Sequence, residues 1–270
     1  MKIITSNKNS LIKKIKTLQR KSSQRKKSKS FVAEGDKEIE KALKNKYEIE
    51  SLFISENSSL IVFNKKDNLS QHLKNCFLVK SDLFKKICYR SSDNNVIAII
   101  KEKEHTFNNL VIPKKSLIII IQSPEKPGNI GAIIRTITAA KIDLLIIADP
   151  KTDLYNPNII RSSLGNVFSL PIIIDTSENI INFLKTNKIE IIVTDLNEKS
   201  LYHDEIDYNL PLALVLGSEN KGVDDNWIQN SDYSVKIPMK PDVDSLNLSV
   251  SAGILIYHII KKVKRIKLIK

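Results

Sequence analysis

The sequence predicts an α/β protein of two domains, a small one followed by a larger one built on a parallel sheet. Three observations predict this class. The chain has 270 residues, enough for one large domain or two ordinary ones. Short apolar runs alternate with helical patterns along the chain. In the second half these runs are apolar at every position, which is typical of parallel strands buried on both faces.

Residues 1–105 have the pattern of a small α/β domain. A basic helix is expected around Ile15, and the polar run 21–30 is expected to end it. A second helix should follow Gly35. The strand candidates are 31–33, 52–55, 77–79 and 96–100. The polar stretch after them indicates a linker, which we set at 106–114.

Residues 115–270 form the second predicted domain, where the alternation is stronger. Helical segments at 130–140 and 180–186 should cover a parallel sheet. Ligands of such sheets bind beyond the carboxyl ends of the strands. The strand candidates are 117–121, 144–148, 191–193, 212–216 and 233–237, and the loops expected at their carboxyl ends are 123–129, 217–222 and 239–247.

Composition excludes several classes of function. The apolar runs are far shorter than the roughly 18 residues of a membrane span. No signal-peptide pattern is present, so we expect a cytoplasmic location. Cys76 and Cys88 form no disulfide or metal pattern, and we expect no metal centre. The net charge of +13 favours a polyanionic partner, nucleic acid first.

Basic residues gather in two zones of the chain. From Lys13 to Lys29 there are nine basic residues and no acidic one, and a second basic stretch runs from Lys261 to Lys267. Either zone could be an electrostatic footprint for nucleic acid, and a solvated face is the alternative for each.

The first chemistry-bearing stretch is 129–136. Asn129 is a good helix N-cap residue, and Arg135 would lie within two turns of the helix start. A guanidinium at that place can grip a phosphate or a developing oxyanion, whereas a surface salt bridge is the alternative.

The second and third stretches are Gly217–Gly222 and 237–253. The loop GSENKG differs from a P-loop because Lys221 precedes the second glycine and neither Ser nor Thr follows it. In the third stretch a strand ends at a proline, and Ser245 and Asn247 are expected to open a helix of small residues.

Together these stretches resemble the SpoU family of RNA ribose 2′-O-methyltransferases, in the knotted SPOUT class. The family's Asn-x-Gly with a later Arg matches residues 129–135, Gly-Ser-Glu-x-x-Gly matches 217–222, and Ile-Pro-Met with Ser-Leu-Asn-x-Ser matches 237–249. The stretch 156–171 looks like the family's intermediate segment. Two positions depart from the pattern: Ser251 replaces the usual alanine, and Lys141 lies where a glycine is common.

The N-terminal part is similar, less specifically, to an L30e-like RNA-binding domain. The carriers are residues 4–9 with the basic helix after them, and Phe31-x-x-Glu34-Gly35. The resemblance implies that this domain binds the RNA substrate. The residues we expect to contact RNA are Lys13, Lys14, Arg20, Arg25, Lys26 and Lys27.

The resemblance further implies S-adenosylmethionine as methyl donor, held in a deep C-terminal trefoil knot, and a homodimer formed through the knotted domains. The implied cofactor contacts are Gly217, Ile237 and Leu246, with Thr194 and Met239 as neighbours. The implied catalytic residues are Arg135, Asn129, Glu219, Ser245 and Asn247.

The catalytic arginine of this set, Arg135, stays protonated in nearly every protein setting. We therefore expect Arg135 to bind a phosphate and stabilise the forming alkoxide rather than act as a base. Glu219 is expected to position its neighbours, with general base as the weaker option.

Ribosomal RNA is the favoured substrate. Two alternatives stay open: a catalytically silent RNA-binding or ribosome-assembly protein of the same fold, and a transfer-RNA 2′-O-methyltransferase. The second is less favoured because those family members often lack a separate N-terminal domain.

Overall fold

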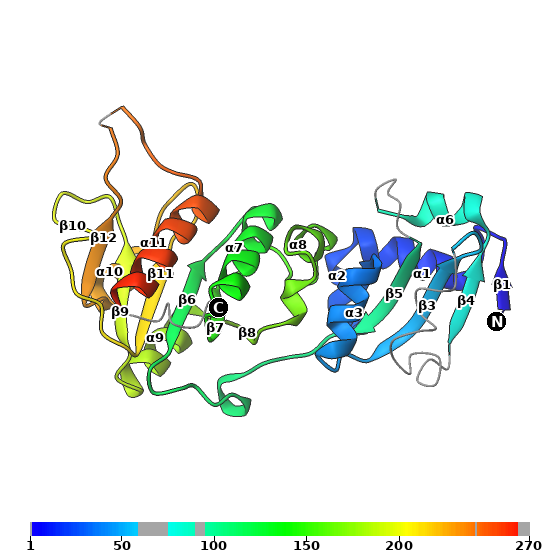
Figure 1. Ribbon diagram of the computed structural model, residues 1–270, viewed down its shortest axis with the longest axis horizontal. Helices are drawn as coiled ribbons and strands as arrows, with labels where there is room; N and C mark the ends of the chain where they lie inside the picture. The colour runs from blue at the N-terminus through cyan, green and yellow to red at the C-terminus, as the bar shows by residue number, and fades with distance from the viewer. Residues whose placement is uncertain (1, 59–74, 90–94, 241, 264–270) are drawn as a thin grey trace. The chain divides into compact units, whose positions relative to one another are not determined.

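The computed structural model describes residues 2–58, 75–89, 95–240 and 242–263. The chain divides into two compact units, each built around its own sheet (Figure 1). Unit 1 comprises Met1–Lys103 and Asp153–Ser169, and unit 2 comprises Glu104–Thr152 and Leu170–Lys270. The basic residues 264–267 lie outside the described residues. Among the described residues, no helix is long and apolar enough to cross a membrane.

Unit 1 holds a mixed sheet, five-stranded within the described residues. Its strands are, from edge to edge, β1 (Lys2–Ile4), β4 (Cys76–Val79), β3 (Ile49–Ser55), β5 (Val96–Lys101) and β2 (Ser30–Glu34). Pairing is parallel between β1, β4 and β3, and antiparallel between β5 and its two neighbours. All four strands expected in this part are confirmed, each with slightly longer ends.

The helices that the structure describes in unit 1 are α1 (Ser10–Arg20), α2 (Ser22–Ser28), α3 (Asp36–Lys44), α6 (Ser81–Ile87) and α8 (Pro157–Ser162). Asn9 caps α1 through its side-chain oxygen, and Ile12, Ile15 and Leu18 form the buried stripe. The expectation that the polar run 21–30 ends the basic helix is confirmed, because α1 ends at Arg20 and the chain turns at Lys21. The run then forms a second helix that was not predicted, α2, which ends at Lys29 with a left-handed φ of 48°.

Residues 153–169, which we call the anchor segment, pack within unit 1 although they lie between two strands of unit 2 in the sequence. The ring of Tyr155 stacks on Phe31 with centroids 4.1 Å apart. Gly165, with φ 72°, passes so close to α3 that a Cβ would lie 2.9 Å from Glu38 Cα. The segment is therefore part of the unit 1 core.

Unit 2 holds a sheet of seven parallel strands among the described residues. The order is β10 (Leu201–Tyr202), β12 (Tyr233–Lys236), β9 (Glu190–Thr194), β11 (Leu212–Leu216), β6 (Leu117–Gln122), β7 (Leu144–Ala148) and β8 (Ile172–Asp175). The central strands are buried at nearly every position, as their apolar runs predict. The parallel α/β class is confirmed.

Helices cover both faces of this sheet. On one face α7 (Pro127–Ala139) and α11 (Leu248–Lys262) lie side by side (Figure 1). On the other, α9 (Ser177–Thr186) and α10 (Asp225–Asn230) share a core with the inward side chains of the strands, to which α10 contributes the fully buried Trp227. A short 3₁₀ turn, η1 (Phe107–Asn109), packs against the same core through Phe107.

Candidate active site

The three motif loops meet at one edge of the unit 2 sheet. Strands β6, β9, β11 and β12 are parallel neighbours, so their carboxyl ends lie together. The loop after β6 leads into α7, the loop after β11 is Gly217–Gly222, and the loop after β12 leads into α11. This edge is where parallel sheets bind ligands.

Hydrogen bonds join one residue from each motif. Asn129 Nδ2 donates to Glu219 Oε1 at 2.5 Å, and Asn247 Nδ2 donates to Asn129 Oδ1 at 3.2 Å. The three residues lie far apart in the sequence, and the fold brings them into one chain of contacts. Glu219 Oε2 is buried and has no hydrogen-bond partner among the described residues.

The prediction that Asn129 caps α7 is wrong. The helix begins two residues earlier, at Pro127, and the cap position is Lys126, which makes no side-chain capping bond. Proline suits the first helical position because its φ is already helical and its missing N–H would be unpaired there. Asn129 is thus inside the helix, which leaves its amide group for Glu219 and Asn247.

Asn247 is the residue that opens α11. Its side-chain oxygen accepts from the Ser249 backbone N–H at 2.9 Å and from Ser249 Oγ at 2.7 Å. Ser245 lies exposed before the helix rather than at its cap. Ser249 belongs to the third motif, but the sequence alone does not indicate a role for its hydroxyl.

The loop Gly217–Gly222 closes on itself. Ser218 and Gly222 exchange two backbone hydrogen bonds of 3.0 Å each. A Cβ on Gly217 would lie 2.0 Å from the carbonyl carbon of Gly222, so only glycine fits at this position. Lys221 is exposed at the tip of the loop.

Three residues of this edge, Glu125, Lys151 and Asn220, were given no role from the sequence. Glu125 pairs with Lys151 Nζ at 2.5 Å and accepts from Asn220 Nδ2 at 2.9 Å. These bonds lower the pKa of the Glu125 carboxyl, mainly through Lys151. They join the loops after β6, β7 and β11. Both loops of the Glu125–Asn220 contact were recognised, but no spacing pattern in the sequence reveals which side chains meet.

A cavity of about 490 Å³ opens beside the Gly217–Gly222 loop, within the usual range for small-molecule sites. Its lining contains every residue that the resemblance assigned to the cofactor: Thr194, Gly217, Ile237, Met239 and Leu246. Glu219 and Ser245 also line it. Apolar and polar residues both contribute to its wall, which fits a flat adenine ring with a charged tail. The assignment of these residues stays a prediction.

Arg135 lies on the exposed side of α7. Its guanidinium forms neither a hydrogen bond nor an ion pair with any residue that the structure describes. The surface salt bridge, which was the alternative interpretation of this arginine, is therefore not seen. Its guanidinium can meet an anionic ligand without first leaving a protein partner.

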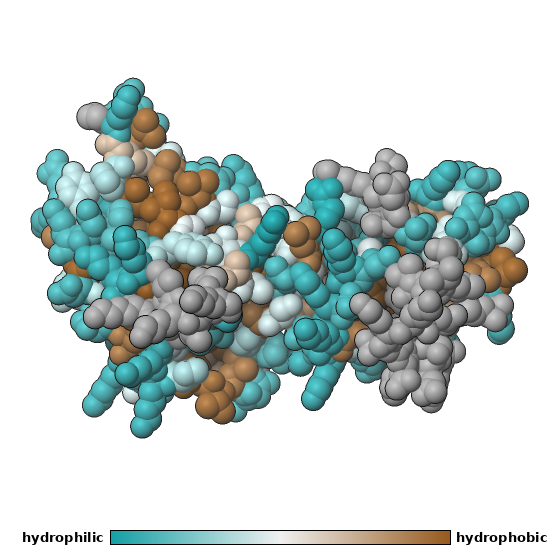
Figure 2. Space-filling model, viewed as in Figure 1, coloured by the Kyte–Doolittle hydropathy of each residue, from teal (hydrophilic) through white to brown (hydrophobic). Residues whose placement is uncertain are grey.

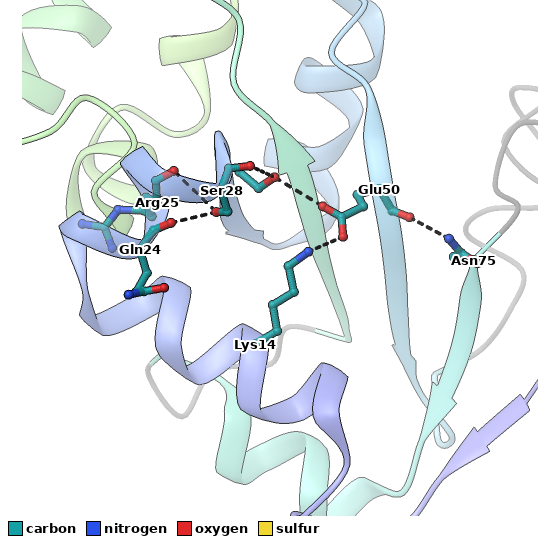
Figure 3. Close-up of polar contacts among 7 residues, drawn as sticks. Lys14, Gln24, Arg25, Ser28, Glu50 and Asn75 are labelled. Carbon is teal, nitrogen blue, oxygen red and sulfur yellow. Dashed lines mark hydrogen bonds and ion pairs between the residues drawn. The ribbon is translucent and has the colours of Figure 1, made fainter.

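The basic residues expected to contact RNA differ in accessibility. Lys13, Arg20, Lys26 and Lys27 are exposed. Lys14 is half-buried and pairs with Glu50, as Figure 3 shows, so part of its charge is neutralised.

The structure contradicts one of the expected RNA contacts, Arg25. Its side chain is 3% exposed and makes a two-pronged ion pair with Asp153, Nε to Oδ1 at 2.8 Å and Nη2 to Oδ2 at 2.6 Å. The expectation that Arg25 contacts RNA is wrong, because its guanidinium holds the anchor segment instead.

Comparison with known proteins places the chain in a family. Residues 116–257, more than half of the chain, match the SpoU rRNA methylase family. The chain belongs to the SpoU rRNA methylase family. Residues 9–98 match the MRM3-like substrate binding domain.

Relatives of this SpoU member cover nearly its whole length. It is 27% identical over 259 residues to the 23S rRNA (guanosine(2553)-2′-O)-methyltransferase RlmP of Bacillus subtilis, covering 96% of this chain and 99% of the relative. A crystal structure of an RNA 2′-O ribose methyltransferase is 30% identical, with a TM-score of 0.81 and coverage of 97% and 99%. The AdoMet-bound rRNA methyltransferase of Sinorhizobium meliloti is 25% identical, with a TM-score of 0.87 and coverage of 96% and 97%.

Proposed function

We propose that this SpoU protein methylates a ribose 2′-hydroxyl of ribosomal RNA, with S-adenosylmethionine as the methyl donor. The observation that carries the proposal is the bonded set of Asn129, Glu219 and Asn247 beside the 490 Å³ cavity. Polar groups held in place beside a cavity of mixed apolar and polar lining are what a reaction between a bound cofactor and an incoming hydroxyl requires. A cytoplasmic location, where ribosomes are found, is part of the proposal.

The cavity residues would hold the cofactor. Leu246 and Ile237 supply apolar walls, Thr194 supplies a hydroxyl, and the closed loop from Gly217 presents backbone groups. S-adenosylmethionine supplies an electrophilic methyl group when it is bound. The proposal includes the trefoil knot that the resemblance implies for this part of the chain.

The residues around the cavity would orient the hydroxyl and manage its charge. In the transfer, the bond from the ribose oxygen to the methyl carbon forms, the sulfur–methyl bond breaks, and the hydroxyl proton leaves to solvent or a carboxylate. Arg135, exposed on α7, would bind the neighbouring phosphate and stabilise negative charge on the oxygen. Asn129 and Asn247 would hold Glu219 in place, and Ser245 would position the substrate.

Unit 1 would bind the RNA. Its exposed Lys13, Arg20, Lys26 and Lys27 come from α1, α2 or the turn between them, so one stretch of chain offers several cations to a phosphate backbone. The match of residues 9–98 to a substrate binding domain supports this role. The methylation of 23S rRNA by the Bacillus subtilis relative supports ribosomal RNA as the substrate class.

A homodimer formed through unit 2 completes the proposal. The helix α11 carries an exposed apolar face of Val250, Ile254 and Tyr257, exposed by 49%, 39% and 44%. Their spacing of four and three residues places them on one side of the helix. Figure 2 shows brown, apolar surface over α11. A second copy of the chain would cover this face, and Ile254→Glu should then convert a dimer into a monomer in gel filtration.

The experiment that tests the proposal has two measurements. Calorimetric titration of the chain with S-adenosylmethionine should show one site per chain. Incubation of ribosomal RNA with tritiated S-adenosylmethionine should then give labelled 2′-O-methylribose after nuclease digestion. Cofactor binding without transfer to ribosomal RNA, but with transfer to transfer RNA, would change the substrate class. Absence of binding would leave the catalytically silent RNA-binding protein as the better reading.

A further inference from the structure

The Asn247 side chain has a fixed orientation. An amide has an acceptor end and a donor end, so the partners of one end decide where the other points. Asn247 Oδ1 accepts from both the backbone N–H and the hydroxyl of Ser249. The Nδ2 group must therefore face the opposite way, where Asn129 Oδ1 accepts its proton.

The orientation of the Asn129 side chain follows in the same way from its partners. Asn129 Oδ1 is occupied by the Asn247 donor, so Asn129 Nδ2 is turned toward Glu219 and donates to Oε1. Glu219 keeps Oε2 without a partner among the described residues. The hydrogen bonds thus run in one direction from Ser249 through the two asparagines to the carboxylate, and we call these four residues the orientation relay.

The Ser249 hydroxyl is not needed to start α11. The helix cap uses the backbone N–H of Ser249, and any residue at this position can supply it. The hydroxyl adds a second bond to the same oxygen, at 2.7 Å. It holds the amide that faces the cavity edge, which gives it a role other than capping.

We propose that Ser249 is a positioning residue for methyl transfer, acting through Asn247 and Asn129 to fix the Glu219 carboxylate beside the cavity. This inference rests on the proposed function. In this arrangement Oε1 accepts from Asn129, and the buried Oε2 is the acceptor left without a partner among the described residues.

The kinetic test compares substitutions that leave the cap intact. Ser249→Ala should lower kcat about fivefold, as expected from the loss of one neutral hydrogen bond, with KM for S-adenosylmethionine within about twofold of wild type. Ser249→Thr, which keeps a hydroxyl, should restore kcat. Ser231→Ala is the matched control, because its hydroxyl donates to the Ile228 carbonyl at the end of α10.

The substitution Asn247→Asp is a stricter test of the orientation relay. Aspartate is an equally good N-cap residue, so the helix start is kept. Its second oxygen would face Asn129 Oδ1, however, so an acceptor would meet an acceptor and the relay would break. We expect a loss of kcat of at least tenfold, and little further loss when Ser249→Ala is added to Asn247→Asp.

A second readout does not depend on activity. In protein labelled with ¹⁵N-asparagine, Ser249→Ala should shift the side-chain NH₂ signals of Asn129, a residue that Ser249 does not touch. The signals are identified by their loss in Asn129→Ala. A wild-type kcat in Ser249→Ala together with unmoved Asn129 signals overturns the inference. If wild-type protein transfers no methyl group to RNA, the proposed function fails, and shifted Asn129 signals still establish the relay.

Discussion

The Arg135 side chain is exposed on α7 and has no hydrogen-bond or ion-pair partner among the described residues. Arg135→Lys keeps the charge but removes the planar fork that can grip a phosphate and an alkoxide together. We expect turnover to fall by roughly 100-fold while the Kd for S-adenosylmethionine stays within about twofold. The measurement is single-turnover methyl transfer beside calorimetry.

The control for the Arg135→Lys variant is a substitution in the same helix, α7. Thr136→Ala removes a hydroxyl that donates to the Ala132 carbonyl within α7, and it should leave turnover near wild type. Near-normal turnover in Arg135→Lys would show that the arginine is dispensable for the chemistry.

Glu34 gives unit 1 a pH-dependent stability. Burial raises the pKa of its carboxyl from 4.5 to about 6, against hydrogen bonds from Tyr89 N and Gln19 Nε2 that lower it. The folded state therefore binds the proton more tightly than the unfolded state. The resulting stabilisation is complete below about pH 4.5 and is lost as pH rises through about 6.

The test of this pH dependence uses Glu34→Gln, which cannot titrate but can still accept both bonds. The unfolding free energy of wild type minus that of the variant should fall by about 2 kcal/mol between pH 4 and pH 7.5. Urea denaturation across this range measures it, with the exposed Glu40→Gln on α3 as control. A difference that stays constant with pH would contradict the raised pKa.

Some functional residues could be predicted from the sequence, whereas the burial of others could not. The resemblance to the SpoU motifs was sufficient to identify Asn129, Glu219 and Asn247, which the structure joins by hydrogen bonds. It could not show that Arg25 is buried, because the partner, Asp153, is 128 positions away. A charge pattern reports how many cations a stretch has, whereas tertiary contacts decide which of them reach the solvent.

The loop Gly217–Gly222 depends on its first glycine. In Gly217→Ala the new Cβ would collide with backbone atoms of Gly222 and Val223 at 2.0 and 2.2 Å, so the loop must open. We expect the affinity for S-adenosylmethionine to fall at least tenfold, measured by calorimetry, together with a lower Tm.

A matched glycine provides the control for that loop. Gly128 lies in the first turn of α7, and a Cβ there would meet nothing within 4 Å. Gly128→Ala should be neutral or raise stability by up to about 1 kcal/mol, because alanine favours helix. Equal affinity in the two variants would mean that the closed loop does not shape the cavity.

Secondary structure could be predicted most accurately for strands that are buried on both faces. The apolar runs 144–148 and 212–216 coincide with β7 and β11 from end to end, since both faces of these strands are covered. Ends set by local chemistry were harder to predict. Pro127 starts α7 ahead of the better capping residue Asn129, and α2 forms in a run without an apolar stripe because Arg25 anchors it.

At the scale of the whole molecule, the buried Arg25–Asp153 ion pair holds the anchor segment in unit 1. Asp153→Ala would leave a buried guanidinium without its counter-charge, which costs about 3 to 5 kcal/mol of unfolding free energy. Lys151→Ala breaks the exposed pair with Glu125, which solvent screens, and should lower the unfolding free energy far less. Urea denaturation and limited proteolysis within 153–169 compare the two, and equal losses would refute a special role for the buried pair.

The anchor segment also affects when unit 1 can fold during synthesis and how chimeras of this protein should be designed. The chain leaves unit 1 after Lys103, returns to it at Asp153 and leaves it again after Ser169. A ribosome must therefore synthesise more than half of the polypeptide before unit 1 has all of its parts, so its folding cannot be completed from the N-terminal stretch alone. Chimeras that exchange RNA-binding domains between relatives should carry residues 153–169 along with the N-terminal domain, because a single crossover near residue 104 would separate Tyr155 from the Phe31 on which it stacks.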